Sequence, residues 1–264
     1  MDIQSAVLVV AHPDDEILWF SSILEQCKRV VVCFGPSATS KESWDHGRAR
    51  LIETYPLAKV KFLNVRQSGG FDDADWKHPE ESDSGLRLRG PAGTAYDCNA
   101  EELLRLLTSE LAQGSVVFTH NPWGEYGHVE HVQVFRVLAR LQKQIGLELF
   151  VDSYVSNRSA NLMTKCLYLV DGSPITRETD KTLARKLKAL YVDNSCWTYD
   201  DDYEWPEFES FYRVRQVGHG VSAKASASVP LNLITRNYDP GALRNIAKRL
   251  LPASVKSFAR KALK

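Results

Sequence analysis

The chain has 264 residues, of which 33 are Lys or Arg and 33 are Asp or Glu, so its formal net charge is zero, and 44% of its residues are hydrophobic. This composition is typical of a globular protein with a sizeable core, and it argues against general nucleic-acid binding, which usually needs a basic excess. The five cysteines are scattered and form no C-x-x-C pair, which argues against a disulfide framework and a cysteine-rich zinc site.

The N-terminal residues do not have the features of a targeting segment. Asp2 stands where a signal peptide would have basic residues, and the apolar run over residues 6–11 is too short for a signal peptide or a membrane span. Together with the unpaired cysteines, this predicts a cytoplasmic protein in a reducing environment.

The first part of the chain alternates apolar runs with amphipathic segments. Residues 6–10 form a continuous apolar run typical of a strand buried on both faces of a parallel sheet, and residues 29–34 and 60–65 repeat it. We expect helices over about 14–28 and 42–55 between these strands. Such βαβ units predict an α/β fold, with a Rossmann-like, mostly parallel sheet and helices on both faces.

Residues 66–98 interrupt this alternation with glycines and many charges. Loops of this length are often lids or binding loops, so we expect substrate contacts here. The alternation then resumes. We expect further strands and helices over these residues: strands 115–119, 147–152 and 166–170, and helices at about 99–112, 127–144 and 177–191. The simplest organisation is a single α/β domain over residues 1–240 with a C-terminal elaboration.

Charge is unevenly distributed towards the C-terminus. Residues 241–264 contain seven bases and no acid, interleaved with apolar residues. This pattern predicts a basic amphipathic helix, which either packs on the domain or lies on an anionic membrane as a peripheral contact at the inner face. Residues 200–209 contain six acids. We expect them to form a solvated loop, with binding of a cationic partner or of the basic tail as the alternative.

Two polar motifs follow predicted strands. Residues 12–16 (HPDDE) come directly after the first strand, and residues 120–131 (HNPWGEYGHVEH) come after the strand at 115–119. The carboxyl ends of parallel strands lie at the same edge of a sheet, and ligands bind at that edge in open α/β folds. We therefore expect the two motifs to converge.

The residue types in these motifs suit a metal hydrolase. Zinc in such enzymes is commonly bound by three His, Asp or Glu side chains, which leaves a position for water. His12, Asp15 and His131 supply such a set, and Fe²⁺ is an alternative for the same ligands. A metal-activated water still needs a base, for which Asp14 is the obvious candidate. His128 is about one helical turn from His131, so if one of the two binds metal the other can point at the substrate.

The HPDDE motif with a downstream GxxGHxxH resembles the PIG-L/LmbE-like N-deacetylases over about the first 150 residues. These are zinc enzymes that remove an acetyl group from N-acetylglucosaminyl conjugates and related amino sugars. The resemblance implies that His12, Asp15 and His131 bind the metal and that Asp14 is the general base. It also implies that His128 polarises or protonates the amide.

The resemblance also covers an R-x-x-E pattern on the second helix, but the second motif departs from the family's usual sequence. Arg50 and Glu53 match the family's R-x-x-E on the second helix, from which the Arg can reach the substrate. The family usually has His-Pro-Asp-His in its second motif, whereas residues 128–131 read His-Val-Glu-His. Glu130 keeps a carboxylate that would orient or charge His128, one methylene further out.

Four other residues in or beside the motifs are candidates for the site. Tyr126 is a candidate second oxyanion donor, and Trp123 is a candidate for stacking on a sugar ring. Asn121 lies near the predicted pocket, and Glu16 is a first-turn carboxylate that can bond to a ligand histidine. Each also has a structural alternative: packing for the aromatic residues, a turn for Asn121, and helix initiation for Glu16.

Taken together, the motifs predict a cytosolic zinc-dependent N-deacetylase of an amino-sugar conjugate. The candidate small-molecule or lipid-linked substrates within this class are a sugar nucleotide, a glycolipid, a thiol-linked sugar and an antibiotic precursor, and the basic tail mildly favours a lipid-linked substrate. One alternative is a carbohydrate-binding or regulatory protein on the same metal scaffold. The other is a hydrolase of a non-sugar amide. Asp14 favours an enzyme over a binding protein, because a binding protein needs no general base.

Overall fold

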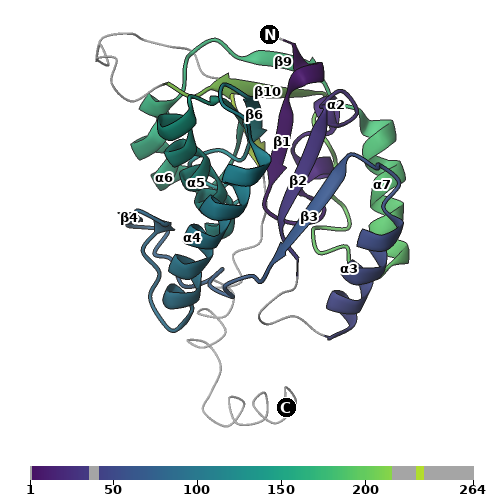
Figure 1. Ribbon diagram of the computed structural model, residues 1–264, viewed down its shortest axis with the longest axis horizontal. Helices are drawn as coiled ribbons and strands as arrows, with labels where there is room; N and C mark the ends of the chain where they lie inside the picture. The colour runs from purple at the N-terminus through teal and green to yellow at the C-terminus, as the bar shows by residue number, and fades with distance from the viewer. Residues whose placement is uncertain (1, 36–41, 216–229, 235–264) are drawn as a thin grey trace. The chain divides into compact units, whose positions relative to one another are not determined.

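A seven-stranded sheet forms the centre of the protein (Figure 1). The computed structural model describes residues 2–35, 42–215 and 230–234. The strand order is β3-β2-β1-β6-β7-β10-β9. The strands are β1 (Val7–Val10), β2 (Arg29–Phe34), β3 (Val60–Val65), β6 (Val116–Thr119), β7 (Glu148–Asp152), β9 (Ile175–Glu178) and β10 (Phe208–Arg213).

The first five strands in this order are parallel, and the last two are not. β1 pairs in parallel with β2 and β6, and these pair in parallel with β3 and β7. β10 runs antiparallel to both β7 and β9. Two small sheets lie outside the main one: β4 (Glu81–Ser82) with β5 (Gly85–Leu86), and β8 (Tyr154–Ser156) with β11 (Asn232–Ile234). The mostly parallel α/β fold predicted from the sequence is confirmed.

Helices cover both faces of the sheet (Figure 1). The helices are α1 (Asp15–Leu18), α2 (Ser21–Leu24), α3 (Glu42–Thr54), α4 (Ala92–Glu110), α5 (Val129–Ile145), α6 (Ala160–Cys166) and α7 (Lys181–Asp193). Figure 1 shows α4, α5 and α6 on one side, and α2, α3 and α7 on the other.

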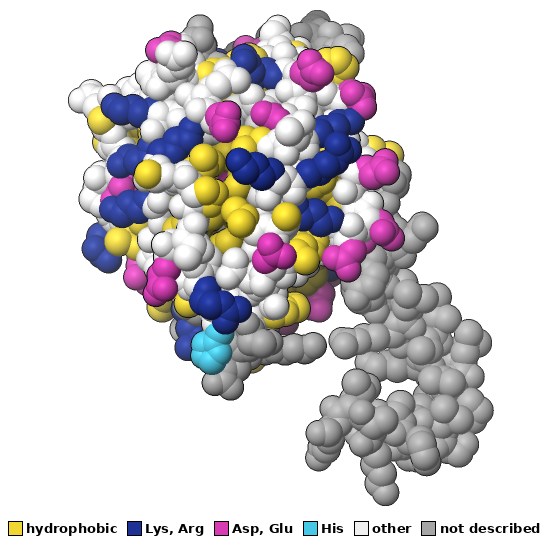
Figure 2. Space-filling model, turned by 90° about the vertical axis from the view of Figure 1, so that its right-hand side faces the viewer, with side chains coloured by type: hydrophobic (Ala, Val, Ile, Leu, Met, Phe, Trp, Pro, Cys, Tyr) yellow, Lys and Arg dark blue, Asp and Glu magenta, His cyan; other side chains and the backbone are white. Residues whose placement is uncertain are grey.

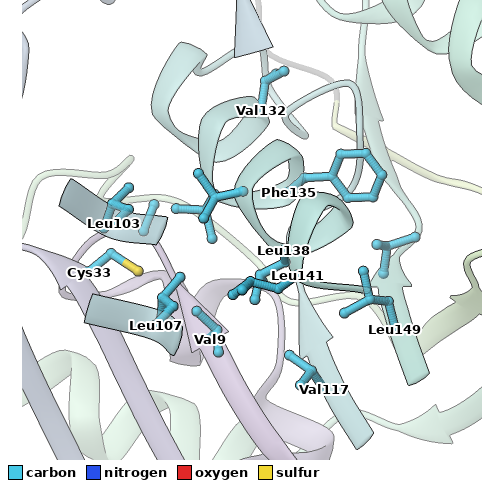
Figure 3. Packing of buried hydrophobic residues seen from close by; sticks show 14 of the residues in the cluster. Val9, Cys33, Leu103, Leu107, Val117, Val132, Phe135, Leu138, Leu141 and Leu149 are labelled. Carbon is cyan, nitrogen blue, oxygen red and sulfur yellow. The ribbon is translucent and has the colours of Figure 1, made fainter. Parts of the chain in front are cut away.

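The alternation of side chains along β1 links two apolar cores, one on each face of the sheet. Val9 packs with Val117 of β6 and Leu138 of α5, as Figure 3 shows. Leu8 and Val10 point to the opposite face and pack in the second core. Because both faces of this strand are covered, its sequence is a continuous apolar run.

α7 packs one side against the domain and exposes the other. Ala184, Leu187 and Tyr191 are buried, whereas Val192 is 50% exposed. Figure 2 shows the face on which α3 and α7 lie, with apolar side chains gathered near its middle and Lys and Arg around them. Through its buried side, α7 brings the Tyr191 ring to the start of α1.

Two expected elements differ in the first half of the chain. The helix expected over 14–28 consists of α1 and α2, with a break at Trp19 and Phe20. Glu209 of β10 stabilises the start of α2, because its carboxylate accepts hydrogen bonds from the backbone N–H groups of Ser21 (3.2 Å) and Ser22 (3.0 Å). The helix expected from about residue 99 begins at Ala92, so the loop from residue 66 is shorter than predicted.

Two further predictions were wrong in the second half. Cys166 ends α6 and Leu167–Leu169 form a short 3-10 helix, so only Val170 of the strand expected over 166–170 pairs, through a single antiparallel bridge to Val214. α7 begins at Lys181 rather than at 177, because Ile175–Glu178 forms β9 and the Asp180 side chain caps the helix by accepting from the N–H of Leu183.

The predicted basic helix over 241–264 lies outside the described residues. Within the described part of the chain, no helix has the length and apolar character needed to cross a bilayer. The acidic stretch 200–209 is not all solvated loop, since Phe208 and Glu209 begin β10 and the Glu209 side chain is buried.

Candidate active site

The two polar motifs meet at the carboxyl edge of the sheet, beyond the ends of the neighbouring strands β1 and β6. β2 lies on the far side of β1 and β7 on the far side of β6, so the chain leaves this pair towards opposite edges. Ligands in open α/β sheets bind in the crevice at such a point. Here His12 Nδ1 lies 3.2 Å from His131 Nε2, although 119 residues separate the two in the sequence.

Three donor atoms form a nearly equilateral triangle. Asp15 Oδ2 lies 3.3 Å from His12 Nδ1 and 3.3 Å from His131 Nε2, and the two ring nitrogens are 3.2 Å apart. A tetrahedral zinc ion with ligand distances of about 2.0–2.1 Å needs donor atoms about 3.3–3.4 Å apart. The three side chains therefore fit one face of a zinc coordination tetrahedron. They are the same three that the sequence suggested as a ligand set.

The charges around this triangle favour a cation. Burial alone would raise the pKa of Asp15, but His131, His120 and His12 hold it well below its usual range. Burial likewise opposes ionisation of Glu130, yet its contact with His12 keeps the pKa of Glu130 below its usual value. Two ionised carboxylates are therefore buried among histidine rings, an arrangement suited to a divalent metal.

Asp14 has an unusual backbone conformation. Its φ is 99°, in a region that non-glycine residues rarely adopt, at a cost of about 1–3 kcal/mol. Its N–H donates to Glu16 Oε2 (3.0 Å) and to the Tyr191 hydroxyl (2.9 Å), which holds this turn. Thr198 Oγ1 donates to Asp14 Oδ2 (2.9 Å). Burial, followed by the charge of Asp15, raises the pKa of Asp14 to about 8.

Of the two roles considered for Glu16, the structure shows the structural one, because its carboxylate contacts the first turn and two tyrosines rather than a ligand histidine. Its carboxylate accepts from the hydroxyls of Tyr55 (2.6 Å) and Tyr191 (2.5 Å) as well as from the N–H of Asp14. The first-turn position directs the side chain back to the turn that carries Asp14. Glu16 therefore fixes the backbone of the candidate base.

The arginine nearest the candidate base is Arg48 rather than Arg50. Arg50 is exposed, and its Nη2 donates to the backbone oxygen of Asn194 (3.3 Å). Arg48 is buried, its Nη1 donates to the backbone oxygen of Gly35 (2.9 Å), and its charge lowers the pKa of Asp14. The two residues are two positions apart, so they face different sides of α3. Sequence reasoning selected Arg50 because it fits the R-x-x-E pattern.

Glu130 contacts His12 rather than His128. Its Oε2 lies 2.8 Å from His12 Nε2, and its Oε1 accepts from the N–H (2.6 Å) and the hydroxyl (2.8 Å) of Ser68. The longer Glu side chain thus orients a ligand of the triangle and anchors the loop after β3. Only the backbone N–H of Glu130 contacts His128, by donating to its Nδ1 (3.2 Å).

His128 is half-buried, and its ring is neutral. Burial and the neighbouring His12 and His131 hold the pKa of His128 well below its usual value. The ring stacks on His131 with centroids 4.7 Å apart. Since Nδ1 accepts the N–H that caps the start of α5, the proton of the neutral ring lies on Nε2.

Aromatic side chains surround the histidines. The Tyr126 ring lies 5.4 Å from the His131 ring and 5.4 Å from the Tyr199 ring, and it is half-buried. Phe71, from the loop after β3, packs 4.9 Å from the His128 ring. Ser68 and Phe71 place this loop beside the motifs, and its predicted substrate contacts stay a prediction. No motif or spacing in the sequence pointed to Tyr199.

Trp123 and Asn121 are not placed to contact a substrate. Trp123 is fully buried and its Nε1 donates to the backbone oxygen of Tyr154 (2.7 Å). Asn121 is fully buried too, and its side-chain amide donates to Asp152 Oδ1 (2.7 Å) and to the same Tyr154 oxygen (2.8 Å). The motif that carries them turns inward directly after β6. Their expected substrate contacts are therefore corrected to structural roles.

A buried His, His and Asp triangle with an adjacent carboxylate, at the carboxyl edge of a parallel sheet, defines a candidate metal-hydrolase site. The family model described as PIG-L, GlcNAc-PI de-N-acetylase, matches residues 7–141. The chain therefore belongs to the PIG-L family, as its motifs predicted.

The chain is also similar to solved structures at low sequence identity. The zinc inhibited form of teicoplanin deacetylase Orf2 is 13% identical with a TM-score of 0.52, over 81% of this chain and 100% of that chain. A deacetylase-teicoplanin complex from the biosynthesis pathway of teicoplanin is 11% identical with a TM-score of 0.48, over 79% of this chain and 97% of that chain. No curated protein matches the chain.

Proposed function

We propose that this protein is a metal-dependent N-deacetylase that hydrolyses the acetamide of an amino-sugar conjugate. Membership of the PIG-L family supports the reaction class and the sugar substrate. The observation that carries the proposal is the triangle of His12 Nδ1, Asp15 Oδ2 and His131 Nε2, with edges of 3.2–3.3 Å beside the buried carboxylate of Asp14.

The metal held by His12, Asp15 and His131 would be Zn²⁺, with Fe²⁺ as the alternative for the same donor set. Such an ion supplies Lewis-acid chemistry: it polarises a carbonyl and lowers the pKa of water. Glu130 holds His12 through Nε2, which leaves Nδ1 of that ring directed at the triangle. Asp15 adds the negative charge that two neutral histidines lack.

Asp14 is the general base in this proposal. Its pKa of about 8, raised by burial and by Asp15, lies near neutral pH. A carboxylate with this raised pKa is a stronger proton acceptor than one exposed to water. The hydrogen bond from Thr198 orients its carboxylate, and Glu16 with Tyr191 fixes its backbone. Asp14 takes the proton of the attacking water, and the tetrahedral oxyanion forms on the former carbonyl oxygen.

His128 donates to that oxyanion. Its Nδ1 accepts the backbone N–H of Glu130, so Nε2 carries the proton and offers it as a hydrogen-bond donor. A neutral imidazole used in this way stabilises developing negative charge without being a strong acid. Tyr126, 5.7 Å away between ring centroids, is the second candidate donor.

The substrate class is tested by mass spectrometry. We expect the zinc-loaded protein to convert an N-acetylglucosamine conjugate, soluble or lipid-linked, into the species in which hydrogen replaces one acetyl group. Asp14→Ala should abolish conversion and retain zinc. Conversion of simple acetylated amines but of no sugar conjugate would identify a non-sugar amidohydrolase. A protein that binds sugars and zinc without converting either class would be a binding protein, and the proposal would fail.

A further inference from the structure

Glu125, which lies inside the second motif, joins two histidines of the candidate site, and the proposed mechanism does not use it. Its Oε1 lies 3.2 Å from His120 Nδ1, and its Oε2 makes a short contact with His131 Nδ1. All three side chains are completely buried. The two rings stack with centroids 3.9 Å apart, so one carboxylate spans the same edge of both.

The far nitrogens of these rings show where their protons lie. His120 Nε2 lies 3.3 Å from Asp15 Oδ2 but closer, at 2.8 Å, to the backbone N–H of Ala11, from which it accepts, so we place the ring proton on Nδ1, facing Glu125. His131 Nε2 faces His12 Nδ1 and Asp15 Oδ2 across the triangle. A histidine that binds metal through Nε2 carries its proton on Nδ1, which again faces Glu125.

The protein holds Glu125 in place through its own backbone. Glu125 has a φ of 45°, its N–H donates to Asn121 Oδ1 (3.2 Å), and its backbone oxygen accepts from the Ser159 hydroxyl (2.5 Å). Its Oε1 also accepts the N–H of Asn121 (3.0 Å). The side chain is therefore fixed before any ligand arrives, which is what a positioning group requires.

We propose that Glu125 is a positioning residue: it sets the tautomer and ring orientation of His131, and of the stacked His120, and so raises the affinity of the triangle for a divalent cation. This inference rests on the proposed metal site and concerns a residue outside its ligand set. The His120 ring, which is hydrogen-bonded to Glu125 and to the N–H of Ala11, stacks against the ring of His131.

Glu125→Gln tests the proposal through zinc affinity. The amide nitrogen of Gln cannot accept a ring N–H, so at least one of the two histidines loses its acceptor. We expect a Kd for Zn²⁺ about 10- to 100-fold higher than in the wild type, measured by competition with a chromophoric chelator. An unchanged Kd in a folded Glu125→Gln protein would overturn the proposal.

Glu209→Gln is the matched control. Glu209 is also a fully buried carboxylate, and it accepts hydrogen bonds from the backbone and hydroxyl groups of Ser21 and Ser22 rather than from histidines. Its replacement makes the same chemical change in the core, and we expect it to leave the Kd for Zn²⁺ within about twofold of wild type. A loss equal to that of Glu125→Gln would show a general effect of the substitution and would overturn the proposal.

A measurement on the wild-type protein covers the case in which Glu125→Gln does not fold. Long-range ¹H–¹⁵N spectra of the zinc-loaded protein report the tautomer of each histidine, and we expect Nδ1–H for both His120 and His131. An Nε2–H tautomer at His120 would overturn the proposal. If the wild-type protein does not bind zinc, the metal site and this inference fail together. If it binds zinc and Glu125→Gln binds equally well, only the role of Glu125 fails.

Discussion

Thr198 donates a hydrogen bond of 2.9 Å from its Oγ1 to Oδ2 of Asp14, across 184 residues of sequence. Asp14 lies within the region that matches the family model, and Thr198 lies beyond it. Tyr191 of α7 makes a second such contact, because its hydroxyl accepts the N–H of Asp14. The second half of the described chain thus completes the surroundings of the candidate base.

Thr198→Val removes the hydroxyl donor and keeps the shape of the side chain. A hydrogen bond to a charged group contributes about 1.5–3 kcal/mol, and because Thr198 is exposed we expect the lower end, a fall in kcat/KM of about tenfold. The hydrogen bond lowers the pKa of Asp14, so its loss should move the acid limb of the kcat/KM profile to higher pH. Thr198→Ser keeps the donor and should restore both. An unmoved acid limb in Thr198→Val would contradict the assignment of Asp14 as base.

His131→Ala and His128→Ala should separate metal binding from turnover. His131 Nε2 is a corner of the triangle, whereas the Nδ1 of His128 caps α5. We expect His131→Ala to lose stoichiometric zinc. His128→Ala should keep zinc and lose about 10²–10³ in kcat, the usual effect of removing one oxyanion donor. Zinc content by elemental analysis, measured beside kcat, checks both. Loss of zinc in His128→Ala would place that residue among the ligands instead.

The sequence was sufficient to predict the parallel strands and the convergence of the two motifs. The run at residues 6–10 is typical of a strand covered on both faces, and parallel strands bring their carboxyl ends to one edge. The antiparallel strands β9 and β10 were not predicted. Glu209 in β10 lies in an acidic stretch that reads as solvated, and it is buried because Ser21 and Ser22 donate to it.

Contacts between distant parts of the chain were the least predictable part of the site. Thr198 and Tyr191 reach Asp14 only because α7 packs against α1, and no local pattern records that packing. The sequence indicated a role for Glu125 only weakly, through its position inside the second motif, between Gly124 and Tyr126. Whether the Glu130 side chain contacts His12 or His128 depends on the position of Ser68, which sequence spacing does not show.

Arg48→Met and Arg50→Met decide which arginine acts on the site. The charge of Arg48 lowers the pKa of Asp14, so its removal should shift the acid limb of the kcat/KM profile to higher pH and reduce activity at neutral pH. Arg50 is exposed and bonds to Asn194, so Arg50→Met should leave that limb in place. The measurement is the kcat/KM profile of each variant from pH 5 to 9, a range that includes the pKa of Asp14 at about 8. If KM instead rose more in Arg50→Met than in Arg48→Met, the result would support the R-x-x-E assignment.

Glu209 should make the free energy of unfolding depend on pH in a direction opposite to that of a salt-bridged carboxylate. Burial raises the pKa of Glu209 above its usual value of 4.5, although the serine hydrogen bonds oppose this. The folded protein then holds a proton that the unfolded chain releases, so the stability is fully present below about pH 4.5 and is lost as the pH rises through the folded pKa. In urea unfolding, we expect the free energy of unfolding of the wild type minus that of Glu209→Gln to fall over this range, by at most about 1.4 kcal/mol per pH unit. Subtracting the variant cancels the titration of the site carboxylates, which both proteins share. A difference that rises with pH would show that the serine hydrogen bonds outweigh burial.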